Sequence, residues 1–119
     1  MFHFPSVFDR NMNWLILIVA GLFEVGFATC LGKARETTGT TSLFWLIGFL
    51  ACLSISMVLL YRATLTIPIG TAYAVWTGIG AVGTVIVGIL LFREATDPLR
   101  IFFLFTLIIS IVGLKLVTR

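Results

Sequence analysis

Four long runs of apolar residues limit this chain to the helical membrane proteins. They extend roughly over residues 14–31, 42–61, 67–92 and 101–117. Each is close to the ~20 residues that an α-helix needs to cross the ~30 Å apolar core of a bilayer. Strands of a membrane β-barrel alternate apolar and polar residues. These runs are continuously apolar, which excludes a barrel.

Composition and length support the same fold class. Of the 119 residues, 60% are hydrophobic and 11% are charged, whereas a soluble domain carries about 25% charged residues. We predict an all-α membrane protein with a single four-helix domain over residues 12–119. Its helices are expected at about 13–32, 42–61, 67–92 and 98–117. Residues 32–41 are expected to form a polar loop, and Pro68 and Pro98 suit the first turns of helices.

Residues 1–11 precede the first apolar run and form no signal peptide, because they are too few and contain no cleavage pattern. We interpret them as an interfacial extension or as a misassigned start ahead of Met12. His3, the single histidine, is expected to have no functional role.

Glu24 lies in the middle of the first apolar run. A charge at the centre of a membrane helix costs about 2.5–3.5 kcal/mol on insertion scales, and such residues usually face a protein interior or an aqueous cavity where protons or ions move. A neutral carboxyl group, hydrogen-bonded between helices, is the structural alternative. At helical spacing, Gly21 and Phe27 share the face of Glu24. Glu24 is therefore the leading candidate for a functional residue.

Polar and aromatic candidates follow in the second and third apolar runs. Ser54 and Ser56 could bond a carboxyl group, or could bond only their own helix backbone. Tyr73 and Trp76 are three residues apart and could form two walls of a site for an organic cation. An interfacial aromatic belt is the alternative for Tyr73. The glycines at 78, 80 and 83 allow close packing of helices and favour a bend.

No sequence pattern indicates an enzyme. There is no metal-ligand spacing, phosphate-binding loop or nucleophile–base pair, and no cofactor is predicted. Cys30 and Cys52 both fall in predicted spans, where we interpret them as small packing residues. A net charge of +3 is too small to indicate a nucleic-acid partner.

Basic residues are balanced across the predicted membrane. One side carries Arg10, Arg62, Lys115 and Arg119, and the other carries Lys33, Arg35, Arg93 and Arg100. Because orientation follows the excess of Lys and Arg in cytoplasmic loops, this distribution sets no strong preference. Either the topology is single and weakly fixed, or copies insert both ways and pair antiparallel.

From Met12 to Arg119 the chain resembles the small multidrug resistance transporters. The likeness lies in Gly-Leu-Phe-Glu-Val at 21–25 and in Pro-Ile-Gly-Thr-Ala-Tyr-Ala-Val-Trp-Thr-Gly-Ile-Gly at 68–80. That second motif, with Gly-Leu-Lys at 113–115, is similar to the guanidinium-exporter subtype. One position departs from the subtype, because Phe27 stands where a tryptophan is usual.

The resemblance implies a proton-coupled antiporter of guanidinium-type cations in the inner cell membrane, acting as an antiparallel homodimer of four-helix protomers. It gives Glu24 the proton and substrate role. The other residues that it assigns to the site are Gly21, Phe27, Ser56, Tyr73 and Trp76. Two alternatives remain open: a broad exporter of quaternary ammonium compounds, and one subunit of a pair with a homologous partner.

Overall fold

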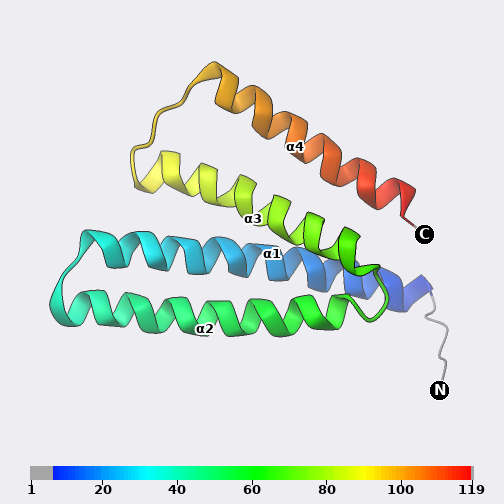
Figure 1. Ribbon diagram of the computed structural model, residues 1–119, viewed down its shortest axis with the longest axis horizontal. Coiled ribbons are helices and arrows are strands. Elements are labelled where there is room, and N and C mark those ends of the chain that lie inside the picture. The colour runs from blue at the N-terminus through cyan, green and yellow to red at the C-terminus, as the bar shows by residue number, and fades with distance from the viewer. Residues whose placement is uncertain (1–6, 119) are drawn as a thin grey trace.

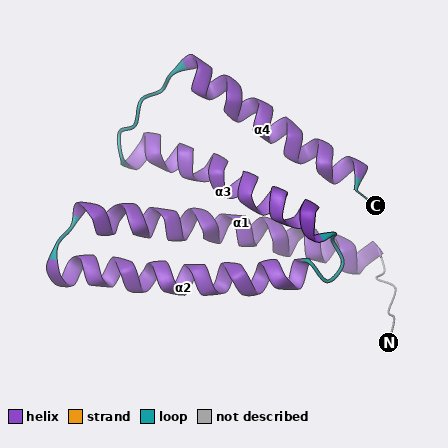
Figure 2. Ribbon diagram, in the orientation of Figure 1, coloured by secondary structure: helices purple, strands orange, loops and turns teal. Residues whose placement is uncertain are grey.

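The chain folds into four helices joined by short connections (Figures 1 and 2). The computed structural model describes residues 7–118. In chain order the helices are α1 (Val7–Glu36), α2 (Gly39–Ala63), α3 (Ile69–Leu91) and α4 (Pro98–Val117). All four are long and apolar enough to cross a membrane. The prediction of a four-helix membrane fold is therefore confirmed.

The helix ends differ from the sequence prediction mainly in α1. This helix is 30 residues long and includes residues 7–11 and 32–36, so the polar loop predicted at 32–41 is wrong. Lys33 and Arg35 lie in its last turn, where positive side chains favour the helix dipole. The Thr37 hydroxyl donates to the Lys33 carbonyl at 2.9 Å and ends the helix. The interpretation of residues 1–11 as an extension or a misassigned start stays a prediction, since residues 1–6 lie outside the described chain.

The later helices agree more closely with prediction. Helix α4 has the predicted bounds, with Pro98 in its first turn and the Asp97 side chain accepting a bond from the Leu99 N–H at 3.1 Å. Pro68 instead caps α3, which begins at Ile69. Glycines 78, 80 and 83 lie within one continuous helix.

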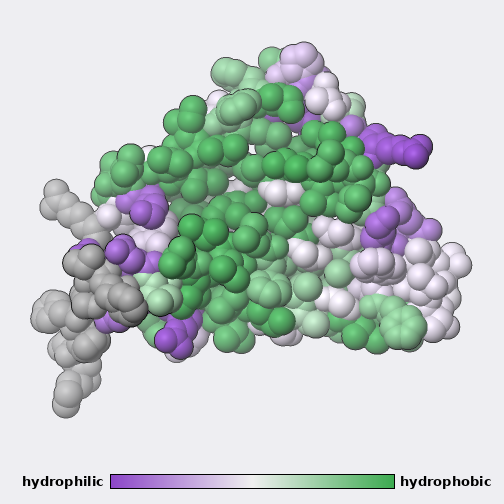
Figure 3. Space-filling view, turned by 180° about the vertical axis from the view of Figure 1, so that it is seen from behind, coloured by the Kyte–Doolittle hydropathy of each residue, from purple (hydrophilic) through white to green (hydrophobic). Residues whose placement is uncertain are grey.

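Helix α1 lies at the centre of the arrangement, and α2 and α3 both pack along it (Figure 1). The backbone of α4 closely approaches α3 alone among the helices. The buried core is small and consists of Leu17, Ala20, Ala63, Ile67, Ala72, Val75 and Trp76. No residue of α4 is buried. On the face shown in Figure 3, hydrophobic residues cover the middle of the molecule and polar residues gather toward its ends, as expected where lipid or another apolar surface covers the helices.

Both ends of the described chain lie at the same end of the bundle as the α2–α3 turn, while the other two connections lie at the opposite end (Figure 1). This arrangement places Arg10, Arg62 and Lys115 together, away from Lys33, Arg35, Arg93 and Arg100. The two groups of basic residues expected from the sequence therefore occupy opposite ends of the helices. Arg119 lies outside the described residues.

Close contact between α1 and α3 depends on glycine. A Cβ atom at Gly21 would lie 2.6 Å from Cγ2 and 2.8 Å from Cβ of Ile79. Both atoms belong to the stiff, β-branched part of that side chain, which cannot rotate away. Gly21 thus brings the two helices together, one turn before Glu24.

We expect Gly21→Ala to lower the stability of the protein, because overpacking costs about 1–3 kcal/mol and exceeds the gain of up to ~1 kcal/mol from better helix propensity. Thermal unfolding in detergent measures the change. Gly70→Ala is the matched control, since no atom lies within 4 Å of its added Cβ, and it should keep or raise the melting temperature. Equal melting temperatures for the two variants would contradict the close contact.

Candidate functional site

Glu24 is half-buried between α1 and α3, and one of its carboxyl oxygens has no partner. Among the described residues, Oε2 of Glu24 is the one buried side-chain oxygen or nitrogen without a hydrogen bond. A polar group buried without a hydrogen bond costs free energy, and an ionised one costs more. The Oε2 atom therefore lacks the hydrogen bond between helices that the structural alternative for Glu24 would provide.

Gly80 of α3 provides the space that the Glu24 carboxyl group occupies. A Cβ atom added at Gly80 would collide with Oε2 and Cδ of Glu24. From the sequence, Gly80 was expected only to allow close packing of helices and a bend, and it was given no part in the site. Gly80 lies one helical turn after Trp76, and this spacing could have indicated that it faces the site.

Ser56 and Trp76 form a chain of hydrogen bonds that joins three helices. The Trp76 indole N–H donates to the Ser56 hydroxyl at 2.9 Å, and that hydroxyl donates to the Ala20 carbonyl at 2.8 Å. Ser56 is fully buried and Trp76 is 7% exposed. The chain thus ends on α1 one turn before Glu24, and its polar atoms are already bonded. Ser54, in contrast, is exposed and bonds the Leu50 carbonyl of its own helix.

The aromatic residues lie in two separate pairs. The rings of Tyr73 and Trp76 are 5.5 Å apart between centroids, and Tyr73 is 58% exposed whereas Trp76 is buried. Phe27 packs edge-on against Phe49 of α2 at 5.7 Å. Tyr73 and Trp76 therefore form one aromatic unit, as the sequence predicted, while Phe27 is held by α2.

The two cysteines are free and pack between α1 and α2. Each sulfur lies where the facing helix has a glycine: a Cβ at Gly26 would be 3.4 Å from the Cys52 sulfur, and one at Gly48 would be 3.2 Å from the Cys30 sulfur. These contacts agree with a packing role.

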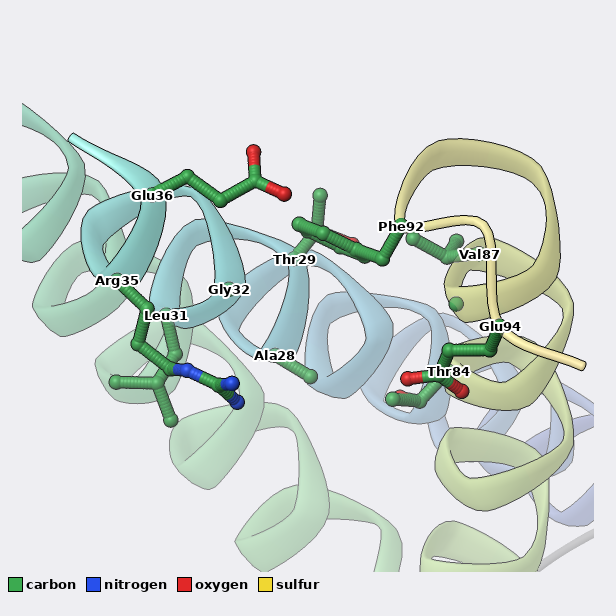
Figure 4. Close-up of a pocket in the computed structure, with 11 residues that line it drawn as sticks. Ala28, Thr29, Leu31, Gly32, Arg35, Glu36, Thr84, Val87, Phe92 and Glu94 are labelled. Atoms are coloured by element: carbon green, nitrogen blue, oxygen red, sulfur yellow. The ribbon is translucent and has the colours of Figure 1, made fainter.

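A cavity of about 550 Å³ opens between α1 and α3 at the end of the bundle that carries Arg35 and Glu94 (Figure 4). Its lining begins at Ala28 and Thr84, which lie one helical turn beyond Glu24 and Gly80 respectively. Figure 4 shows Arg35 and Glu36 on the α1 side and Phe92 and Glu94 on the α3 side. The cavity therefore extends from the polar end of the bundle to within a turn of the buried carboxyl group.

The chain is similar to known proteins over most of its length. Residues 12–108 match the family model described as Small Multidrug Resistance protein. The chain belongs to this family. It is a multi-pass membrane protein.

Relatives in several bacteria share nearly half of its residues. A protein of Citrobacter freundii and one of Salmonella typhimurium, both named guanidinium exporter, are 47% identical to it over 108 residues, which cover 91% of this chain and 100% of each relative. A guanidinium exporter of Escherichia coli K12 is 45% identical over the same length. These relatives are named as transporters and not as enzymes.

We expect Gly80→Ala to displace the Glu24 carboxyl group and to leave the fold intact, because the added methyl group meets a flexible side chain. Glutamate occurs at positions 24, 36 and 94 only, so carbon-13 labelling of glutamate resolves its Cδ resonance by NMR. The Glu24 resonance should shift in Gly80→Ala and stay in place in Gly70→Ala. An unmoved resonance would contradict the contact between Gly80 and Glu24.

Proposed function

We propose that this protein is a proton-coupled antiporter that exports guanidinium, or small guanidinyl and quaternary ammonium cations, across the inner cell membrane. The observation that carries the proposal is the buried, unpartnered Glu24 oxygen beside Gly80. The names of the relatives, guanidinium exporter, support the same substrate class.

The chemistry of the site suits a planar organic cation. A carboxylate accepts parallel N–H bonds from a guanidinium group, and such charge-assisted bonds are stronger than neutral ones. The indole N–H of Trp76 is committed to Ser56, so Trp76 offers a ring face and not a donor. Together with Tyr73, that face attracts a cation through the ring quadrupole. The proposed site is completed by three further residues. Ser56 holds the Trp76 indole, Gly21 allows the close approach of α1 and α3, and Phe27 adds an apolar wall.

Coupling follows from competition for one carboxyl group. In an apolar bundle the Glu24 charge can be neutralised by a proton or by a cation, and the two exclude each other at the same oxygens. If the protein changes conformation only when the carboxyl group is neutralised, outward movement of a cation is exchanged for inward movement of protons. The proton gradient then drives export.

We infer that the active form is an antiparallel homodimer. Helix α4 has no buried residue, Tyr73 is exposed at the edge of the site, and the sequence predicts equal numbers of basic residues on the two sides of the membrane. A second, inverted copy would cover apolar faces of the protomer and bring a second Glu24 toward the first. Two carboxyl groups in one cavity would then titrate as a coupled pair.

We expect Glu24→Gln to abolish coupled transport, because glutamine keeps the size of the side chain but cannot carry a charge or exchange a proton. Substrate-driven current from purified protein in proteoliposomes measures this loss, with guanidinium as the substrate. Glu36→Gln is the control: Glu36 is exposed and lies 3.6 Å from Lys33, and its variant should keep the current.

Retained proton-driven export in Glu24→Gln would overturn the proposed function. Current from the purified wild-type protein alone would exclude the need for a homologous partner subunit. Absence of current with every cation would favour a need for that partner. Current restored by co-reconstitution with a homologue would then establish this need.

We expect Tyr73→Leu to weaken guanidinium binding about 5- to 30-fold, because a cation–π contact contributes roughly 1–2 kcal/mol. Tyr73→Phe keeps the ring and should retain most of the affinity. Tyr61→Leu is the matched control, since Tyr61 is 68% exposed and lies in the last turns of α2. Calorimetric titration of the purified protein measures all three variants, and equal affinities would remove Tyr73 from the site.

A broad exporter of quaternary ammonium compounds is the second candidate, favoured by Phe27. Its edge contact with Phe49 gives the neighbourhood of Glu24 an apolar wall without a hydrogen-bond donor. Tetraalkylammonium currents larger than guanidinium currents in the same proteoliposomes would select this candidate. The reverse order would select the guanidinium exporter.

A further inference from the structure

A second, smaller cavity lies at the opposite end of the bundle from the one described above. It has a volume of about 210 Å³ and lies where α1 begins, where α2 turns into α3 and where α4 ends. The residues that line it are Arg10, Asn11, Trp14, Thr66, Ile67, Pro68, Lys115 and Thr118. It is separate from Glu24 and has no part in the proposed transport site.

Two positively charged residues, Arg10 and Lys115, line the cavity, and no acid is among the described residues that line it. Lys33 pairs with Glu36 and Arg100 pairs with Glu94 at the opposite end of the bundle, and neither ion pair includes Arg10 or Lys115. Lys115 Nζ instead lies 5.5 Å from the centroid of the Trp14 ring. The nearest acid in sequence, Asp9, does not line the cavity. Two cations in one small cavity that no acid lines favour an anionic ligand.

A hydroxyl donor points to the same class of ligand. Thr66 accepts a bond of 2.6 Å from the Asn13 side-chain amide, which is buried. Because that bond uses an oxygen lone pair, the hydroxyl hydrogen of Thr66 stays available to donate. A phosphate group, with several acceptor oxygens, would satisfy this donor and both cations.

The surroundings of the cavity select a phosphate that is attached to lipid chains. Beside it the side chains of Ile69 and Leu116 are 75% and 79% exposed, which offers an apolar surface along the membrane-spanning helices. Trp14 has the amphipathic ring that occurs at membrane interfaces. Basic pockets between helix ends bind the head groups of anionic lipids elsewhere.

We propose that this cavity binds the phosphate head group of an anionic phospholipid, held by Arg10 and Lys115 beside Trp14. Both cations lie outside residues 12–108, the part of the chain that matches the family model. The site is independent of the function proposed for Glu24.

Native mass spectrometry of the purified, full-length protein tests the proposal, with phosphatidylglycerol and phosphatidylcholine of equal chain length as probes. We expect wild-type protein to bind phosphatidylglycerol at least about tenfold more tightly than phosphatidylcholine. The double variant Arg10→Gln/Lys115→Gln should lose about 30-fold in phosphatidylglycerol affinity, since each cation near the membrane surface contributes about fivefold. Lys115→Arg keeps the charge and should retain binding.

Arg62→Gln/Arg93→Gln is the matched control, because it also removes two positive charges and neither residue lines the cavity. An equal loss in this control would assign the binding to diffuse surface charge and overturn the proposal. Displacement of phosphatidylglycerol by an equal concentration of inorganic phosphate would assign the cavity to a soluble anion and overturn it as well. If the double variant fails to fold, the wild-type protein still tests the proposal. Equal affinity of the wild-type protein for the two lipids would refute the site.

Discussion

The buried oxygen of Glu24 is the constraint on which the rest of the arrangement depends. Within the described protomer it accepts no hydrogen bond, although an unsatisfied acid in an apolar bundle is costly. The neighbouring groups do not donate to it. Gly80 leaves room for the carboxyl group but has no side-chain donor. The Trp76 N–H is bonded to the Ser56 hydroxyl, which is bonded to the Ala20 carbonyl. Any partner of this oxygen must therefore come from outside the protomer. A proton, a cation or a second copy would each meet that requirement.

The two aromatic residues near the site differ in how firmly they are held. Trp76 is buried and its indole is anchored through Ser56 to the backbone of α1, so it moves only if α1, α2 and α3 move together. Tyr73 is mostly exposed, and its ring contacts the ring of Trp76. One wall of the aromatic pair is thus fixed by the fold, while the other can adjust to the shape of a ligand. A fixed wall beside an adjustable one favours a class of cations over a single molecule.

The sequence predicted the features that depend on local composition. Continuous apolar runs identified four spans, Pro98 indicated the start of α4, and the lone acid in the first span made Glu24 the leading candidate. It did not predict which residues touch across helices, because the register between two helices depends on packing along their whole length. The contact of Gly80 with Glu24 and the bond from Ser56 to Ala20 are both of this kind. The end of α1 was placed too early for a different reason: Lys33 and Arg35 are polar but stabilise a helix C-terminus.

The two ends of the bundle differ in a way that bears on pairing of inverted copies. At one end Glu36 and Glu94 bind Lys33 and Arg100 beside a large cavity that reaches toward Glu24. At the other end Arg10 and Lys115 line a small cavity among the helix ends, and no acid is among its described lining residues. A protomer of fixed orientation would offer each leaflet only one of these surfaces. In an antiparallel dimer each leaflet would contact one end of each kind. Lipid contacts and access to the carboxyl groups would then be equivalent on both sides of the membrane. Such equivalence is what a transporter requires if its two conformations are the same structure seen from opposite sides.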